Sequence, residues 1–238
     1  MTSFTCAAPL ASRSTTPKTP NILSPNLDTQ PSPSWAGAVA SASEPTLATM
    51  EWNEPADSTI DDEALFWAGI GGWNDSNLIQ TGTEMNDGAG LTYHQFWYES
   101  WPSETIQPVS APTVVAGDDV AVQVRYEGGI AFFTDCNMSN NTCSNYSETV
   151  PSPGATAECV AERPLEQPGS FYFPLSNFGT VVFTNCIYGV GENPVAVYFT
   201  SGNSWPVDMV NSSGQVLASS PGPDSSGPNL AVTWHLAG

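Results

Sequence analysis

Hydrophobic and polar residues alternate with a period of two in several short stretches of the chain. In residues 120–127, three valines and a tyrosine at every second position alternate with small, polar or charged residues. Residues 195–199 repeat this spacing, and residues 179–188 are rich in β-branched and aromatic side chains. Successive side chains of a strand point to opposite faces, so this period predicts half-buried β-strands.

The segments between these stretches are rich in Gly, Pro, Asn and Asp, which favour turns. No window has the 3.6-residue spacing of an amphipathic helix, and the 21 prolines would interrupt one. For residues 34–238 the pattern predicts an all-β fold, an antiparallel β-sandwich or barrel. Residues 1–33 are rich in Pro, Ser and Thr without apolar periodicity, and we expect a disordered arm or the remnant of a propeptide there.

Charge narrows the classes of partner. The chain has 24 acidic residues against 4 basic ones, a net charge of −20. Binding to nucleic acid or to an anionic membrane requires clustered Lys and Arg, so neither partner is expected. No stretch approaches the length of a membrane span. An acidic medium would protonate many carboxylates and relieve their repulsion, so the composition suits a protein that works in acid.

Cysteines and glycosylation motifs bear on the compartment. A disulfide between Cys136 and Cys143, two of five cysteines, would close a local hairpin. Five Asn-x-Ser/Thr acceptor motifs favour secretion from a eukaryotic cell; they begin at Asn74, Asn137, Asn140, Asn145 and Asn211. Residues 1–20 lack the apolar core of a signal peptide, so we expect that a leader has been removed or that the gene start is incomplete.

Motifs for metals, phosphate and nucleophilic serine are missing from the sequence. Only two histidines, His94 and His235, are present, and no Cys-x-x-Cys pair occurs, so no zinc site is expected. There is no Gly-x-Ser-x-Gly elbow, and the glycine-rich residues 69–72 lack the strand and helix of a phosphate-binding unit. We therefore expect neither a metal nor a cofactor.

Three segments place carboxylates or amides among aromatic residues. In a strand over residues 78–84, Gln80, Gly82 and Glu84 share one face. In residues 157–164, Glu158 and Glu162 share a face, and Cys159 and Ala161 point the other way, toward the core. The third segment has five residues on one face, namely Tyr93, Gln95, Trp97, Glu99 and Trp101.

Each segment alone has a more ordinary interpretation. A Gln in a strand usually faces solvent, and Glu162 beside Arg163 fits a surface acid. The aromatic face of residues 93–101 is more often sandwich core, although its Gln and Glu would need partners there. Cys159 fits either a small buried hydrophobe or half of a disulfide with Cys186.

Six motifs, in order, resemble those of the glutamic peptidases, or eqolisins, a family of secreted acid proteases found mainly in fungi. Ile79–Gly82 matches the family's Leu-Gln-Thr-Gly, in which the Gln is catalytic. Ala157–Pro164 resembles its Ala-Glu-x-x-x-Glu, in which the second Glu is catalytic. The other four are Trp35–Ala38 for Trp-Gly-Gly-Ala, Phe66–Ile70 for Trp-Val-Gly-Ile, Trp97–Pro102 for Trp-Tyr-Glu-Trp-Tyr-Pro, and Phe183–Cys186 for Phe-Thr-Asp-Cys.

The resemblance implies a concanavalin-like pair of curved antiparallel sheets whose concave face forms the substrate cleft. It implies that Gln80 and Glu162 are the catalytic pair of a secreted acid endopeptidase that acts on polypeptides without a cofactor. We expect a monomer. The resemblance also implies a set of cleft residues, namely Trp67, Glu84, Gln95, Trp97, Glu99 and Trp101.

The implied mechanism uses an ionised Glu162 with a pKa near the reference value of about 4.3. This carboxylate would take a proton from the attacking water and deliver it to the leaving amine. The amide of Gln80 would donate to the oxyanion and help to hold the water. Crowded carboxylates are further predicted to have raised pKa values in the folded state, so that stability falls between about pH 4 and pH 8.

Two departures from the family pattern keep alternatives open. Gly71 and Gln95 stand where the best-known members have acids near the active site. These changes would alter substrate preference, raise the pH optimum or weaken the enzyme, and one alternative is therefore an inactive relative that serves as a secreted binding sandwich. The other is a glycosidase in which Glu99 and Glu162 are the acid and the nucleophile.

Overall fold

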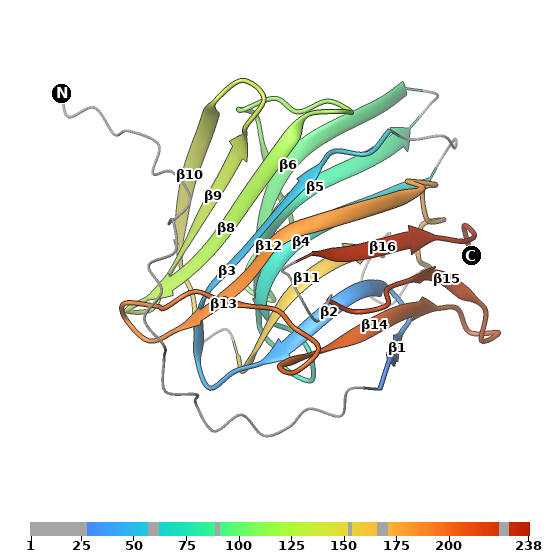
Figure 1. Cartoon of the computed structure of the whole chain (residues 1–238). Helices are drawn as coiled ribbons and strands as arrows, with labels where there is room; N and C mark the ends of the chain where they lie inside the picture. Colours follow the sequence, from blue (N-terminus) through green and yellow to red (C-terminus); the bar gives the residue numbers. More distant parts are fainter. Residues whose placement is uncertain (1–27, 57–61, 89–90, 152–153, 166–170, 224–228) are drawn as a thin grey trace.

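The computed structural model describes residues 28–238 except 57–61, 89–90, 152–153, 166–170 and 224–228 (Figure 1). In this part of the chain all regular structure is β-strand, as the alternation predicts. The strands are β1 (Gln30–Ser32), β2 (Trp35–Ser41), β3 (Pro45–Asn53), β4 (Glu63–Gly71), β5 (Leu78–Gly88), β6 (Leu91–Trp101), β7 (Gln107–Val109), β8 (Asp119–Glu127), β9 (Ile130–Asn137), β10 (Thr142–Thr149), β11 (Thr156–Glu162), β12 (Thr180–Val190), β13 (Val197–Tyr198), β14 (Ser204–Val210), β15 (Val216–Ser219) and β16 (Leu230–Trp234).

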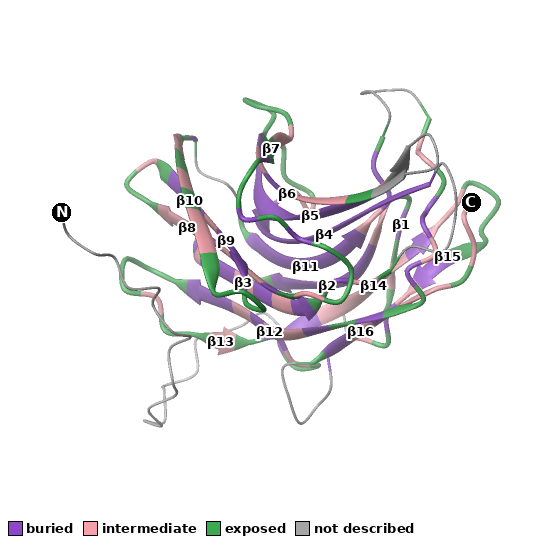
Figure 2. Ribbon diagram, turned by 90° about the horizontal axis from the view of Figure 1, so that it is seen from above, coloured by how far each residue is buried: buried purple, intermediate pink, exposed green. Residues whose placement is uncertain are grey.

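The strands form two layers joined along one side. Hydrogen bonds connect them in the order β10-β9-β8-β3-β12-β16-β15-β14-β2-β11-β4-β5-β6-β7. This path folds over between β16 and β14, so that β2, β11, β4, β5 and β6 form an inner curved layer against an outer layer of β9, β8, β3 and β12 (Figures 1 and 2). Among the described strands every pairing is antiparallel except that of β1 with β14. The expected antiparallel β-sandwich of two curved sheets is confirmed.

The sequence pattern finds most strands but not all of their limits. β8 alternates buried and less buried residues as predicted, and β12 covers the predicted residues 179–188 almost completely. The expected strand over residues 195–199 is wrong in extent, because only Val197–Tyr198 pairs with β12. Val195 is mostly exposed and follows Pro194, which has no N–H to continue a ladder.

Residues 28–33 depart from the disordered arm that composition predicts. Gln30–Ser32 forms β1 and pairs in parallel with Val207–Met209 of β14. The hydroxyl oxygen of Ser32 is buried and accepts hydrogen bonds from the backbone N–H groups of Ser34 and Trp35. Composition cannot anticipate this pairing, since it depends on a partner strand about 175 residues later in the chain. Residues 1–27 lie outside the described residues.

The main core fills the space between the two layers and is built from alternate residues of each strand. A smaller cluster of Leu65, Trp67, Leu78, Trp97 and Val160 lies on the other face of the inner layer. Small residues such as Ala36, Ala68 and Ala161 let the inner layer pack closely. The inner layer therefore has apolar residues on both faces, and β4 is buried along its whole length.

The structure tests the predictions made for the cysteines and for membrane-spanning segments. Cys136 and Cys143 form a disulfide between β9 and β10, as predicted. Cys159 is buried in the core on β11, and Cys186 is buried beside it with its thiol also free. Of the two interpretations of Cys159, the structure therefore shows the small buried hydrophobe. In the described chain no helix has the length and apolar character needed to cross a membrane.

Candidate active site

Strand register places the candidate residues on the inner layer in three parallel rows. Each row crosses β11, β4, β5 and β6, and its side chains point away from the main core. The Gln80 row contains Glu158, Gly69, Gln80 and Glu99; the Trp67 row contains Val160, Trp67, Gly82 and Trp97; the Glu162 row contains Glu162, Leu65, Glu84 and Gln95. Polar rows thus flank a central aromatic row on one face of the sheet.

Gln80 is buried beside a carboxyl group. Its Nε2 donates a hydrogen bond to Oε2 of Glu99 at 2.5 Å. Its Oε1 is also buried and has no hydrogen-bond partner among the described residues. A buried carbonyl oxygen without a donor is costly, so this atom is suited to accept a hydrogen bond from a bound water or substrate.

Burial also changes the acidity of Glu99. Burial raises its pKa to about 7, although the bonds from Gln80 and from the backbone N–H of Ile106 lower it. A carboxyl group with this pKa is neutral in an acidic medium.

Glu162 lies in a setting of indole donors. Nε1 of Trp67 donates to Glu162 Oε2 at 2.7 Å, and Trp35 forms a second side-chain hydrogen bond to the same carboxyl group. The rings of Trp35 and Trp67 meet edge to face with centroids 4.9 Å apart, which fixes both donors. Burial and the charge of Glu99 raise the pKa of Glu162 to about 8, and the two indole bonds lower it.

This pKa overturns one sequence-based expectation. The pKa of Glu162 does not stay near the value of an exposed Glu, and the resting carboxyl group is protonated in acid. The reason is that the apolar rings that position the group also exclude water, and burial disfavours its charged form more than two indole N–H groups favour it.

Gln80, Glu99, Glu162 and Trp101 all line one cleft with a volume of about 920 Å³. Its other lining residues are mostly apolar or aromatic, and they include Trp35, Leu65, Trp73, Ile106 and Tyr172. The rows that form this cleft belong to the hollow face of the inner layer (Figure 2). The cleft therefore combines apolar walls with an amide and two carboxyl groups.

Two glycines leave space for the side chain of Trp67. A Cβ atom on Gly69 would lie 2.8 Å from Cζ3 of Trp67, and one on Gly82 would lie 2.0 Å from the carbonyl oxygen of Phe66 and 2.7 Å from Cβ of Trp67. Neither contact is sterically possible without a shift of the backbone or of the indole. The glycines therefore position the ring that donates to Glu162.

Arg163 holds one wall of the cleft. Its backbone N–H donates to Ser34 O at 2.8 Å, and its Nη2 donates to Pro33 O at 3.2 Å. Its guanidinium lies 4.6 Å from the ring centre of Tyr172. Ser34, Pro33 and Tyr172 all line the cleft, so Arg163 is a structural neighbour of Glu162 rather than part of an exposed acid–base pair.

A second group of carboxyls lies beside the Glu162 row. The carboxyl group of Glu63 is hydrogen-bonded to that of Glu84, which requires a shared proton. Burial and the charge of Glu84 raise the pKa of Glu63 to about 8, so Glu63 holds the proton. Glu84 also accepts bonds from Tyr93 OH at 3.0 Å and Gln95 Nε2 at 2.8 Å.

The two departures from the family pattern have local explanations. Gln95 donates to Glu84, whereas an acid at this position would add a third carboxyl group to the Glu63–Glu84 pair. Gly71 has a φ of +90°, a conformation that other residues rarely adopt. Both replacements therefore agree with the structure around them.

The predicted site residues do not all reach the cleft. Gln80, Glu99, Glu162 and Trp101 line it. Trp67 and Trp97 are fully buried, and both belong to the apolar cluster on the cleft side of the inner layer. Glu84 and Gln95 bond to each other next to the cleft and do not line it.

Sequence reasoning missed Glu63, and it did not propose Trp35 as a partner of Glu162. Glu63 starts β4 and has no motif around it, and only the register of β4 with β5 brings it near Glu84. Trp35 is opposite Glu162 in the pairing of β2 with β11, so correct pairing of those strands would have identified it. Glu158 is on the predicted face but is fully buried, and burial holds its pKa well above the usual range.

Within the described residues, no group of three or more His, Cys, Asp or Glu side chains is arranged to hold a metal ion.

Comparison with known proteins gives matches in family and in fold. A family model described as "Peptidase A4 family" matches residues 33–228. None of the curated proteins matches the chain in sequence. Among solved structures, scytalido-glutamic peptidase with a transition-state-analogue inhibitor has a TM-score of 0.72 and 21% identity, and the match covers 85% of this chain and 98% of that chain.

Two further solved structures have a similar fold. SCP-B, a member of the eqolisin family in complex with the tripeptide Ala-Ile-His, has a TM-score of 0.68 and 20% identity over 85% of this chain and 98% of its own. Aspergilloglutamic peptidase from Aspergillus niger has a TM-score of 0.58 and 24% identity over 73% of this chain and 99% of its own. At these identities the structures establish a shared fold. The family model covers most of the chain, and the protein therefore belongs to the Peptidase A4 family, the eqolisins or glutamic peptidases.

Proposed function

We propose that the protein is an acid endopeptidase in which Glu162 and Gln80 hydrolyse peptide bonds. The observation that carries this proposal is the shared cleft, which is lined both by Glu162, whose carboxyl group is bonded to two indoles, and by Gln80, whose carbonyl oxygen has no partner among the described residues. The amide is suited to hold a water, and the carboxyl group is suited to transfer protons. Membership in the glutamic peptidases supports peptide bonds as the substrate.

The proposed reaction begins with a neutral Glu162. Its proton passes to the carbonyl oxygen of the scissile bond while the water at Gln80 attacks the carbonyl carbon. The resulting carboxylate, stabilised by the N–H groups of Trp35 and Trp67, takes a proton from the attacking water. This gives a neutral gem-diol and restores the protonated Glu162.

The second half of the reaction uses the same group. Glu162 gives its proton to the amide nitrogen, the C–N bond breaks, and the amine leaves. The carboxylate then recovers a proton from the protonated carboxylic acid product. Glu162 begins and ends the cycle protonated, which agrees with its raised pKa.

Gln80 contributes through hydrogen bonds. Because its Nε2 is bonded to Glu99, its orientation is fixed and its Oε1 is left to accept a bond from the water. An amide cannot ionise, so this acceptor stays neutral at every pH. Glu99 is then a positioning residue for Gln80.

The cleft walls favour apolar side chains of an extended polypeptide. Trp35, Trp73 and Trp101 provide large flat surfaces around the polar groups. Related structures hold a peptide-based transition-state analogue and a tripeptide, which supports polypeptides as the substrate class.

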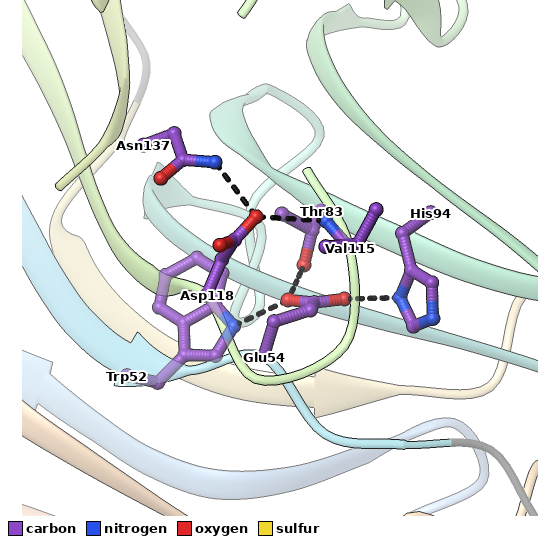
Figure 3. Close-up of polar contacts among 7 residues, drawn as sticks. All are labelled: Trp52, Glu54, Thr83, His94, Val115, Asp118 and Asn137. Carbon is purple, nitrogen blue, oxygen red and sulfur yellow. Dashed lines mark hydrogen bonds and ion pairs between the residues drawn. The ribbon is translucent and has the colours of Figure 1, made fainter. Parts of the chain in front are cut away.

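We also propose that the protein is secreted. The disulfide between Cys136 and Cys143 suits an oxidising compartment, and the high negative charge suits an acidic medium. Of the five glycosylation acceptors, Asn137 is buried. Its Nδ2 donates to Asp118 Oδ2 (Figure 3) and also to Thr113 O. The other four motifs remain as acceptors.

The glycosidase alternative loses its support. It needs Glu99 and Glu162 as an independent acid and nucleophile, but Glu99 is bonded to Gln80. The family match also favours peptide bonds over glycosidic bonds.

The test compares cleavage of an acid-denatured protein by the wild type, Glu162→Gln and Gln80→Ala. We expect each substitution to lower kcat by at least about 100-fold, because each removes a group that acts in the transition state. Glu104→Gln, a change at an exposed acid, is the control and should keep full activity. Melting temperatures check that the variants fold. Near-normal turnover by Glu162→Gln would remove the assignment, and a wild type without turnover would favour the inactive binding relative.

A further inference from the structure

The side of β5 that faces away from the cleft is hydrogen-bonded to carboxyl groups of the opposite layer. Thr81 and Thr83 lie between Gln80, Gly82 and Glu84 along β5, so they point into the sandwich. Thr83 Oγ1 donates to Glu54, at the end of β3, and Thr81 Oγ1 is bonded to Asp135 of β9. Both threonines behind the candidate active site therefore contact carboxyl groups of the outer layer.

The Glu54 contact has a full set of donors. One oxygen accepts from Trp52 Nε1 at 2.8 Å and from Thr83 Oγ1 at 2.7 Å. The other oxygen pairs with Nδ1 of His94 at 2.8 Å (Figure 3). Each of the three partners of Glu54 can donate a hydrogen bond, and His94 does so in the tautomer that carries its proton on Nδ1.

The Asp135 contact is different, because the hydroxyl group of Thr81 cannot supply the protons for both of its hydrogen bonds. Oγ1 of Thr81 lies 2.6 Å from Oδ1 of Asp135 and 2.8 Å from the carbonyl oxygen of Trp97. Two hydrogen bonds among three oxygens require two protons, but the hydroxyl group of Thr81 has one and the peptide carbonyl has none. The second proton must therefore belong to Asp135, which donates to Thr81 while Thr81 donates to Trp97.

The surroundings of Asp135 favour this neutral form. The side chain is fully buried, and its Oδ2 has no partner among the described residues. Burial raises the pKa of Asp135 to about 7, and the bond with Thr81 lowers it. The titratable groups that face the same interior are His94 and Tyr98 from β6, Tyr126 from β8, Tyr146 and Glu148 from β10, and Glu54 after β3, with Cys159, Cys186 and Tyr188 further along the core.

We propose that Asp135 is a neutral positioning residue whose hydrogen bond to Thr81 holds the strand of Gln80 in place in acid and fails as the medium becomes neutral. Thr81 is the direct neighbour of Gln80, and Trp97 is two residues from Glu99 in the adjacent strand. The chain Asp135–Thr81–Trp97 therefore joins β9, β5 and β6 directly behind the Gln80–Glu99 bond.

Loss of the proton would remove more than one bond. An ionised Asp135 would be a buried charge with a single donor. The one hydroxyl proton of Thr81 could then be donated either to the carboxylate or to the carbonyl oxygen of Trp97, but not to both. One of the 2.6 Å and 2.8 Å contacts would become a repulsion between oxygens. Because the two layers contact each other here, β5 would move relative to β9, and Gln80 would lose its fixed position.

Asp135→Asn tests this inference, since its amide donates to Thr81 at every pH but cannot ionise. We expect the melting temperature of the wild type to fall between about pH 5 and pH 8. The melting temperature of Asp135→Asn should fall by on the order of 5–10 °C less over the same range. The activity of the variant at acid pH should be unchanged within about twofold, and its loss of activity near neutral pH should begin at a higher pH.

Two controls accompany this variant. Asp119→Asn, at an exposed acid of β8, should follow the wild type at every pH. Asp135→Leu removes both the donor and the titration, so it should melt lower than the wild type in acid but with a flatter pH dependence. Titration of the Asp135 carboxyl ¹³C resonance in the wild type reports the proton directly and does not depend on whether a variant folds.

Two results would overturn the inference. One is a carboxyl resonance that shows an ionised Asp135 at about pH 5. The other is an Asp135→Asn variant with the same pH slope of melting temperature as the wild type. The proton on Asp135 is inferred from geometry alone, whereas its effect on turnover rests on the proposed function. If no turnover is seen at any pH but the melting curves separate as expected, the proposed function fails and the role of Asp135 stands.

Discussion

The environment of Glu162 decides which chemical role its carboxyl group can have. An exposed Glu would be ionised over most of the acid range, and it would then serve first as a base. Here burial beside Trp35 and Trp67, together with the charge of Glu99, raises its pKa to about 8. At the residue scale, the same indoles that bury the group also stabilise the carboxylate that forms during proton transfer.

Trp67→Phe tests this balance, because it keeps most of the aromatic bulk and removes one N–H donor. The bond from Trp67 lowers the pKa of Glu162, so its loss should raise that pKa further and move the high-pH limb of activity upward. The carboxylate form would also be less stable, and kcat at acid pH should fall by about tenfold. A pH–rate profile of the variant measures both effects. A high-pH limb that moves downward would contradict this account of the indole.

Residue-level sequence reading reached the catalytic candidates but not their acidity. Gln80 and Glu162 follow from short motifs that resemble those of the glutamic peptidases, and strand parity adds only which neighbours share their face. The pKa of Glu162 depends on Trp35 and Glu99, which strand pairing brings close from distant parts of the chain. The Glu63–Glu84 pair was missed for the same reason, since it depends on the pairing of β4 with β5.

At the scale of elements, β5 has different tasks on its two faces. Gln80 reaches the cleft and Glu84 binds Glu63 and Gln95, while Thr81 and Thr83 on the other face bind acids of the outer layer. Alternation predicts which residues share a face, and for β5, β6 and β11 this prediction is confirmed. It does not predict how deep a residue lies, so Trp97 was expected in the cleft and is instead fully buried.

Gly82→Ala tests the close contact between β5 and β4. The new Cβ would lie 2.0 Å from the carbonyl oxygen of Phe66, so the strands would have to separate and Trp67 would shift. We expect a loss of at least about 3 kcal/mol in the free energy of unfolding, measured by chemical denaturation. Gly202→Ala is the matched control, because its nearest atom would be Thr200 Oγ1 at 3.7 Å and no positive φ is involved. Equal stability of the two variants would contradict the role of Gly82.

For the whole molecule, buried carboxyl groups link stability to acid. The pKa values of Glu63, Glu99, Asp135 and Glu162 are raised to about 7 or 8 from ordinary values of 4.5 for Glu and 3.8 for Asp. Their contribution to stability is complete below the unfolded values and is lost as pH rises through the folded values. The fall of stability with rising pH therefore stays a prediction, and its physical cause is burial of these carboxyl groups rather than surface crowding.

Thermal melting between pH 4 and pH 8 measures this linkage. We expect the melting temperature to be highest near pH 4 and to fall by more than about 10 °C toward pH 8. The reason is that ionisation of the buried carboxyl groups costs more free energy in the folded state than in the unfolded state. Added salt should reduce the fall only in part, since screening acts on surface charges more than on buried ones. A melting temperature that is flat or rises over this range would contradict the linkage.

The pH dependence of kcat/KM for an unstructured peptide tests the central claim most directly, with the wild type and Glu162→Gln measured in parallel. The account predicts wild-type turnover that is high in acid and is lost as pH rises through about 7 to 8, where Glu99 and Glu162 ionise. It predicts no turnover by Glu162→Gln at any of these pH values. Wild-type activity that increases toward neutral pH, or substantial turnover by Glu162→Gln in acid, would contradict it.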